Sequence, residues 1–394
     1  MKTTNSFIRI KKMYMNYKYP ITIYRKLNLQ PIKKIFLLLL SLTILNCAKK
    51  PEYYAMDDFE KVDKIDVHIH IGTKRNVFVE QARKDNFRLL DIVVDGSEGM
   101  EKIIEKYNYR LDTKTRNPKD VEFATAFSMQ EWDDADWVKN TIDWLNKSFA
   151  EGAIAVKVWK NVGMVFKDKN GELVMVDDPK LDTIFNFLTE RKIPLIGHLG
   201  EPKNCWLPIE EMTVNNDKSY FRDHPQYHMY KHPEMPSYEE QIAARDRMLE
   251  KNPNLIFIGA HLGSLEWSVD ELAERLDKFP NMSVDMAARI GQLFYQTKED
   301  REKVRAFFVK YQDRILYATD MGDSGEEDAV KKQSEMHEVW LRDWKYFATD
   351  DIMTSDLISG EFQALHLPRD VMDKIYLKNA KKWLNMFPDN QKEN

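Results

Sequence analysis

Two histidines lie two residues apart in a short apolar segment, IDVHIHIG, at residues 65–72. Successive side chains of a β-strand point to opposite faces, so His68 and His70 would share one face with Asp66. The other face would carry only isoleucine and valine. On an exposed edge strand these polar side chains could be incidental, but in a strand that is buried on both faces they need partners.

Further residues that could bind a metal or transfer protons lie near the ends of other apolar segments. They are His198 in IPLIGHL, His261 in LIFIGAHL and Asp320 in RILYATD, together with Lys157 in AIAVKVW. Imidazole and carboxylate groups suit a divalent metal such as zinc. A single buried histidine is more often a hydrogen-bonded core residue, but several strands that carry such residues at equivalent depth favour one shared site.

Eight short β-rich segments alternate with helical segments from residue 61 onward. The predicted strands are 64–71, 89–95, 122–128, 153–159, 193–199, 255–262, 282–287 and 314–320, and several have the continuous apolar composition of parallel strands covered on both faces. Amphipathic helices are predicted at 97–107, 136–150, 179–191, 238–251, 266–279 and 298–312. This alternation predicts an α/β fold, a (β/α)8 TIM barrel over residues 61–388. A doubly wound open sheet is the alternative, but the Gly-rich nucleotide turn that often follows its first strand is absent.

The loops after the strands form the active-site face of such a barrel, so the strand-end residues would point toward one mouth. One loop is much longer than the others: residues 201–236, rich in Pro, His and aromatic residues, form a predicted lid. Within it, Trp206 and Arg222 are expected to shape a substrate pocket. Arg289, just past the seventh predicted strand, could clamp a substrate carboxylate or could be salt-bridged to Asp285 or a helix end.

Three lid histidines, His224, His228 and His232, have the i, i+4, i+8 spacing of one helix face. A second metal site is therefore an alternative reading of this segment. Pro225 and Pro233 argue against the continuous helix that such a site would need.

The strand-end motifs resemble the amidohydrolase superfamily, and in detail the amidohydrolase-related family that includes aminocarboxymuconate semialdehyde decarboxylase. The matching stretches are IDVHIHIG, AIAVKVWK, PLIGHLGEP, FIGAHLGS, NMSVDMAARIGQL and DRILYATD, spread over roughly residues 61 to 385.

The resemblance implies one divalent metal, expected to be Zn²⁺, held by His68, His70, His198 and Asp320. It implies that His261 is an unligated acid/base residue and that Asp320 also accepts a proton from the metal-activated water. In binuclear relatives the lysine equivalent to Lys157 is carboxylated and bridges two metals. In the family that this chain resembles it contacts substrate or structure, so one metal is expected.

The N-terminal region has the features of a lipoprotein signal peptide. Residues 1–46 carry nine Lys or Arg and no Asp or Glu, and end in the apolar run IFLLLLSLTIL, which is too short to span a bilayer. Cys47 follows LTILN in the position of a lipidation site, and residues 47–60 would form a tether. A plain secretory signal and an N-terminal anchor helix are the alternatives. We expect a bacterial cell-envelope protein, anchored by lipid on the periplasmic or surface face.

Charge and cysteine content exclude several classes of partner and site. After residue 46 the chain has 50 basic and 64 acidic residues, a net charge of −14, which should repel nucleic acid and anionic lipid headgroups. If Cys47 is acylated, Cys205 is the only remaining thiol, so neither an intrachain disulfide nor a thiolate metal site is expected. The partners expected are a small-molecule substrate and, through acyl chains, a membrane; a homodimer is compatible with the sequence.

The leading functional hypothesis is a metal-dependent hydrolase that uses metal-activated water on an amide, lactone or ester-like bond of a small carboxylate-bearing substrate. A non-oxidative decarboxylase, which is a lyase, would need the same residues. The third hypothesis is a lipoprotein that binds a ligand without catalysis. It predicts that a strand-end residue is missing, but all of the strand-end residues are present.

Overall fold

The computed structural model describes residues 52–388. The predicted signal peptide and the lipidation site at Cys47 lie outside these residues. No helix within residues 52–388 combines the length and the apolar character needed to cross a bilayer.

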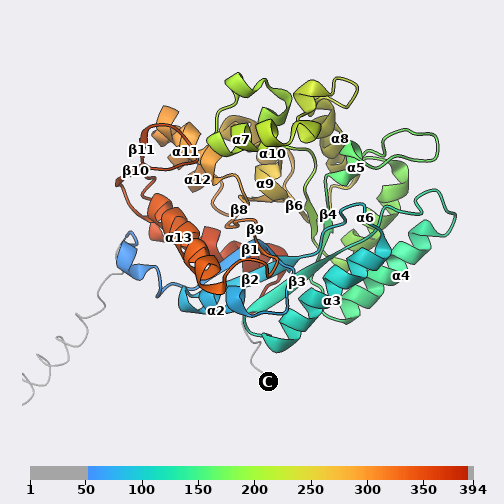
Figure 1. Cartoon of the computed structure of the whole chain (residues 1–394), viewed down its shortest axis with the longest axis horizontal. Coiled ribbons are helices and arrows are strands. Elements are labelled where there is room, and N and C mark those ends of the chain that lie inside the picture. Colours follow the sequence, from blue (N-terminus) through green and yellow to red (C-terminus); the bar gives the residue numbers. More distant parts are fainter. Residues whose placement is uncertain (1–51, 389–394) are drawn as a thin grey trace, which may run out of the picture. The chain divides into compact units, whose positions relative to one another are not determined.

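The core of the fold is one parallel sheet whose strands follow each other in chain order (Figure 1). All eight predicted strands are present, with the bounds β1 (Lys64–Ile71), β2 (Phe87–Ile92), β3 (Val121–Ala126), β4 (Ala155–Val158), β5 (Leu195–Gly197), β6 (Phe257–Gly259), β7 (Met282–Asp285), and β8 (Ile315–Leu316) continued by β9 (Met321–Asp323). Each strand pairs in parallel with its neighbour. The expected TIM-barrel fold is confirmed.

The eighth predicted strand is divided in two because it closes the barrel. Its first part, β8, pairs with β7, and its second part, β9, pairs with β1. Between them the Tyr317 carbonyl accepts a hydrogen bond from the Val67 N–H at 3.1 Å, and the Asp320 N–H donates to the His68 carbonyl at 2.9 Å. The chain therefore crosses from the last strand to the first, and Asp320 is placed beside the histidines of β1.

Helices cover the outer face of the sheet, as the amphipathic segments predict (Figure 1). Their bounds are α2 (Val77–Lys84), α3 (Met100–Arg116), α4 (Trp137–Ala150), α6 (Pro179–Arg191), α8 (Tyr238–Lys251), α10 (Val269–Lys278), α11 (Ile290–Glu299), α12 (Arg301–Lys310), α13 (Ala329–Ala348), α14 (Arg369–Asp373) and α15 (Asn379–Leu384), with a π-helical turn, Lys374–Lys378, between the last two. Short turns α5 (Asn161–Met164) and α9 (Ala260–Gly263) follow β4 and β6. A small hairpin, β10 (Ile352–Thr354) and β11 (Glu361–Gln363), follows α13.

The predicted lid, residues 201–236, consists of short turns around one helix, α7 (Asn215–Asp223). The turns are η2 (Lys203–Trp206), η3 (Ile209–Glu211), η4 (Pro225–Tyr227) and η5 (Met229–Lys231). Cys205, Met212 and Phe221 form a small apolar cluster of their own within the lid. The lid thus has its own core.

Residues 52–60, the second half of the predicted tether, pack against the C-terminal part of the chain. Tyr54 and Phe59 are buried, and the Tyr54 hydroxyl donates to Asp373 at 2.7 Å. The short helix η1 (Met56–Asp58) lies between them.

Candidate metal centre

A β-bulge in β1 sets the direction of its histidines. Asp66 pairs with Leu89 of β2, but Ile69 pairs with Asp91, so β1 carries one extra residue between these two pairs. The Asp66 carboxylate accepts from the His68 N–H inside the bulge at 3.2 Å. Because of this extra residue, the side chains after the bulge point to the face opposite to the one that simple alternation from Asp66 would give.

The prediction that Asp66 shares a face with the two histidines is wrong because of this bulge. Ile65 and Val67 pack among apolar residues of other strands such as Ala124 and Ile196, whereas Ile69 belongs to the larger core that includes helix α2. Asp66 instead accepts hydrogen bonds from Trp340 of α13 and from Thr319. It supports the strand from the helix side, and burial raises its pKa to about 7 despite these bonds.

His68 is buried between two groups of opposite charge. Its Nδ1 lies 2.9 Å from the Asp285 carboxylate, and its Nε2 lies 3.2 Å from Lys157 Nζ and 3.5 Å from Asp320 Oδ1. Burial and the charge of Lys157 lower the pKa of His68, so its imidazole is neutral. Burial likewise lowers the pKa of Lys157 to about 8.

His70 lies beside Asp320 at the more open side of the site. Its Nδ1 donates to the Ile92 carbonyl at 3.0 Å, and its Nε2 lies 3.2 Å from Asp320 Oδ1. Burial alone would raise the pKa of Asp320, but the hydrogen bond with His70 and the charges of His68 and His261 hold it well below its usual value. Asp320 is therefore a carboxylate.

His198 and His261 form a buried pair. His198 Nδ1 lies 3.1 Å from His261 Nε2, and His261 Nδ1 donates to the Ala287 carbonyl at 2.8 Å. Burial, followed by the repulsion of nearby cationic groups, lowers the pKa of both histidines well below the usual value. His198 Nε2 is buried without a hydrogen-bond partner among the described residues.

These hydrogen bonds fix which ring nitrogens carry protons. Nδ1 of His68, His70 and His261 faces an oxygen acceptor, so in neutral rings Nε2 carries the lone pair. The His261 lone pair accepts from His198 Nδ1, which leaves His198 Nε2 bare. Among these Nε2 atoms, that of His198 has no partner among the described residues, whereas a metal would replace the contact of His68 Nε2 with Lys157 and that of His70 Nε2 with Asp320. Imidazole nitrogens beside a carboxylate are the ligands that a divalent metal such as zinc takes.

The site residues converge on one cavity of about 540 Å³. It is lined by His68, His70, His198, His261, Asp320, Lys157, Lys160, Trp159, Lys106, Glu98, Val94 and Gly96. Ligand atoms of His68, His261 and Asp320 lie within 4.8 Å of one another and could hold a metal ion. His70 and His198 lie next to this group: His70 contacts Asp320, and His198 contacts His261. The donor set fits a divalent metal.

The turn that carries His261 has an unusual backbone. His261, Leu262, Gly263 and Ser264 all have φ between +56° and +65°, the left-handed region that costs non-glycine residues energy. Gly259 makes room for it, because a Cβ there would lie 2.8 Å from the Gly263 Cα. The Asp285 carboxylate accepts from the His261 N–H at 2.9 Å and holds the turn.

Asp285 is the functional residue that the sequence reasoning missed. It binds the His68 ring, the His261 N–H and, at 3.1 Å, the Ala287 N–H. Burial would raise its pKa, but contacts with His68 and the charges of His261 and Lys157 lower it to about 2. Asp285 lies at the end of the seventh strand, in NMSVDMA, and this strand-end position could have identified it as a site residue.

The other predicted substrate residues lie in different surroundings. Trp206 donates to the Pro236 carbonyl inside the lid, and Arg222 is exposed; neither lines the site cavity. Arg289 makes no salt bridge to Asp285 or to any other described residue, and its Nε is buried without a partner. Its charge nevertheless lowers the pKa of both His198 and His261, which places it near the pair.

The lid histidines do not form a metal site in the described structure. Their segment folds as two short turns, as the prolines predict, and His228 Nε2 is bonded to the Leu207 carbonyl at 2.7 Å. His224 stacks on Tyr220 with ring centroids 4.6 Å apart.

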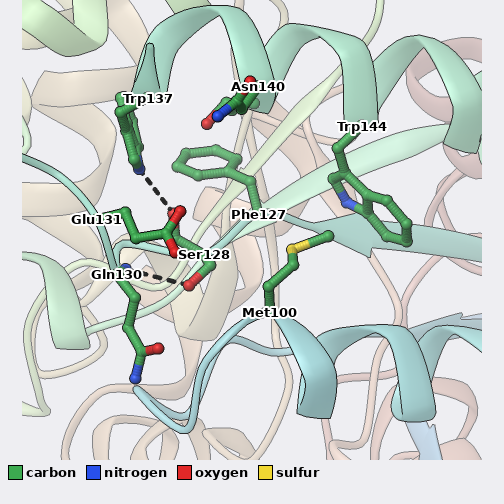
Figure 2. Close-up of a pocket in the computed structure, with 9 residues that line it drawn as sticks. Met100, Phe127, Ser128, Gln130, Glu131, Trp137, Asn140 and Trp144 are labelled. Carbon is green, nitrogen blue, oxygen red and sulfur yellow. Dashed lines mark hydrogen bonds between the residues drawn. The ribbon is translucent and has the colours of Figure 1, made fainter. Parts of the chain in front are cut away.

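A second pocket lies between α3 and α4 at the end of β3, and none of the predicted site residues lines it (Figure 2). Figure 2 shows Trp137, Asn140 and Trp144 projecting from α4 toward Phe127 and Met100. Both indole N–H groups are bonded to backbone carbonyls, of Ser128 and Ala126. At about 120 Å³ it is much smaller than the site cavity.

The chain is similar to one family model and to several solved structures. No curated protein matches the chain by sequence. Among solved structures, 2,6-dihydroxybenzoate decarboxylase from Rhizobium matches at 12% identity with a TM-score of 0.49, over 82% of this chain and 98% of its own. 5-Carboxyvanillate decarboxylase from Novosphingobium aromaticivorans, complexed with manganese, matches at 12% identity with a TM-score of 0.48, over 84% of this chain and 97% of its own. The 5-carboxyvanillate decarboxylase from Sphingomonas paucimobilis matches at 12% identity with a TM-score of 0.44, over 82% of this chain and 99% of its own. The family model described as amidohydrolase matches residues 65–386, from the first strand to beyond the last helix. The chain therefore belongs to the amidohydrolase family.

Proposed function

We propose that this protein is a metal-dependent hydrolase that cleaves an amide, lactone or ester-like bond in a small carboxylate-bearing substrate. The observation that carries the proposal is that five candidate ligand and acid/base residues line one cavity: His68, His70, His198, His261 and Asp320.

We propose that His68, His70, His198 and Asp320 hold one divalent metal, Zn²⁺. The partnerless Nε2 of His198, the position of His68 and His70 Nε2 beside Asp320, and the ionised Asp320 support this set, whereas His261 Nε2 is bonded to His198. When bound, such a metal supplies a Lewis acid and a water of lowered pKa. A metal-to-protein ratio near two would contradict the single site.

The protonation states of the site residues suit proton acceptance. Asp320 is ionised and can take a proton from an attacking water. His261 can act on the substrate's reacting group once its Nε2 exchanges the hydrogen bond with His198 for one with the substrate. Asp285 keeps His68 in one orientation. Lys160 in the cavity wall and Arg289 nearby supply positive charge for a substrate carboxylate.

Decarboxylation is the second candidate. The positive charges around the cavity, which include Lys106, Lys157 and Lys160, would also hold a carboxylate that is itself lost as CO₂. Decarboxylation requires delivery of a proton to carbon. The same histidines and Asp320 in the same cavity would serve either reaction.

One experiment separates the two reactions. Metal-loaded protein is incubated in ¹⁸O-labelled water with a panel of lactones, amides and aromatic acids, while CO₂ is monitored and products are analysed by mass spectrometry. Hydrolysis is expected, with one ¹⁸O in the product and no turnover by Asp320→Asn. CO₂ release without ¹⁸O incorporation would overturn the hydrolase proposal.

A further inference from the structure

We infer that the lid builds an apolar subsite next to the metal centre, so that the substrate is elongated and carries a ring-sized apolar group beyond the bond that is cleaved. This inference rests on the proposed function, because it extends the substrate outward from the His/Asp cluster.

The subsite is a cavity of about 340 Å³ under the second half of the lid. Aromatic and thioether side chains dominate its walls: Trp159, Met164, Tyr220, Tyr227, Met229 and Met235. Small-molecule sites occupy roughly 300 to 1,000 Å³, and a cavity of about 150 Å³ accepts benzene, so a ring with a short linker fits this volume. Methionine side chains adapt to the shape of an aromatic guest.

The lid cavity adjoins the metal centre through shared walls. Trp159 and Lys160 line both cavities. Lys160 is ion-paired with Glu201, and its Nζ lies 5.3 Å from the centre of the Trp159 ring. One molecule can therefore place its reacting group and carboxylate among the histidines and cations, and its apolar group beyond Trp159.

Exposed apolar side chains are concentrated in the walls of this cavity. Seven large hydrophobic side chains are exposed between residues 52 and 388, and Val165, Tyr220 and Tyr227 line this cavity. Val165 is 57% exposed and Tyr227 is 49% exposed. Covering such side chains with an apolar group releases water at a favourable free energy.

The lid histidines hold part of this wall in place. Tyr220 and Tyr227 have ring planes 9° apart with centroids at 6.4 Å, and His224 stacks against both rings. Rings that already pack on one another need less ordering when an apolar group binds against them.

The test compares two probes that differ only by a ring, 4-phenylbutyrate and butyrate. Their dissociation constants for the zinc-loaded protein are measured by calorimetry, without any need for turnover. We expect 4-phenylbutyrate to bind at least tenfold more tightly. Tyr227→Ala and Val165→Asp should reduce this preference at least fivefold and leave butyrate binding unchanged. Because Val165 is exposed, its substitution does not threaten folding.

Tyr230→Ala is the matched control, because Tyr230 lies in the same lid and is 55% exposed but does not line the cavity. It should keep the full preference for 4-phenylbutyrate. Equal affinity for the two probes, or an equal loss in Tyr230→Ala, would overturn the subsite. An intact preference for 4-phenylbutyrate together with CO₂ release without ¹⁸O incorporation in the labelled-water experiment would refute the hydrolase and leave the subsite supported.

Discussion

Asp285 links His68 to the turn that carries His261, because it binds the His68 ring and the His261 N–H. In Asp285→Asn the ring of His68 loses its ionised partner. We expect the affinity for zinc to fall about 10- to 100-fold, as is typical when such an outer ligand partner is lost. Competition with a chelator measures this loss.

Asp343→Asn is the control for Asp285→Asn. Asp343 is also a buried carboxylate, bonded to Tyr317 and Arg342 on the outer side of the barrel. Its substitution should lower stability and leave zinc affinity unchanged. Equal zinc affinity in wild type and Asp285→Asn would refute the role assigned to Asp285.

At the residue scale, the histidines and Asp320 stood out in the sequence because they are polar residues at the ends of apolar runs, and the structure brings them to one cavity. Prediction from the sequence failed on Asp66, since a one-residue bulge leaves no clear trace in an alternating pattern. Asp285 was missed because one aspartate in a short strand looks like any other until its hydrogen-bond partners are known.

Among the structural elements, the left-handed turn after β6 is the most demanding. In Gly259→Ala the new Cβ would lie 2.8 Å from Gly263, and backbone cannot move aside cheaply. We expect the free energy of unfolding to fall by about 1–3 kcal/mol, measured by denaturant titration. Gly72→Ala is the control, since its Cβ meets only the Asp323 carbonyl at 3.7 Å and should be tolerated. Equal stability of both variants would contradict the tight packing of the turn.

Glu266 connects the start of the lid to the barrel and should make stability depend on pH. It is fully buried, accepts from the Lys203 N–H at 2.8 Å, and burial raises its pKa from 4.5 to about 7. Between these values the folded state binds more protons than the unfolded state, so this contribution to stability is present at low pH and is lost as the pH rises through 7.

Glu266→Gln resembles the neutral acid at every pH and should remove this dependence. Relative to this variant, the wild type should lose up to about 3 kcal/mol of unfolding free energy between pH 5 and pH 8. Denaturant titrations at several pH values measure the difference. Parallel pH profiles would show that Glu266 does not titrate in this range.

The positions of helices could be predicted where the spacing of apolar residues and the composition of the segment both indicate a helix. For example, α6 and α8 have the predicted bounds. Barrel closure could not be predicted in detail. The eighth strand divides because the chain leaves β7 and joins β1, a pairing between the two ends of the barrel.

For the whole molecule, we propose that Cys47 carries a lipid anchor that holds the barrel at a bacterial membrane. The variant Cys47→Ser should move from the membrane fraction to the soluble fraction after expression in a bacterial host. Cys205→Ser is the control, because this thiol is buried in the lid, and it should stay with the membrane. Retention of Cys47→Ser in the membrane fraction would favour an anchor helix.

The most direct test of the central claim is the anomalous diffraction of zinc-loaded crystals at the zinc absorption edge. We expect one peak, about 2.0 to 2.2 Å from Nε2 of His68, His70 and His198 and from an Asp320 oxygen, with His261 outside the ligand shell. A peak bonded to His261 in place of His198, or no peak in this cavity, would contradict it.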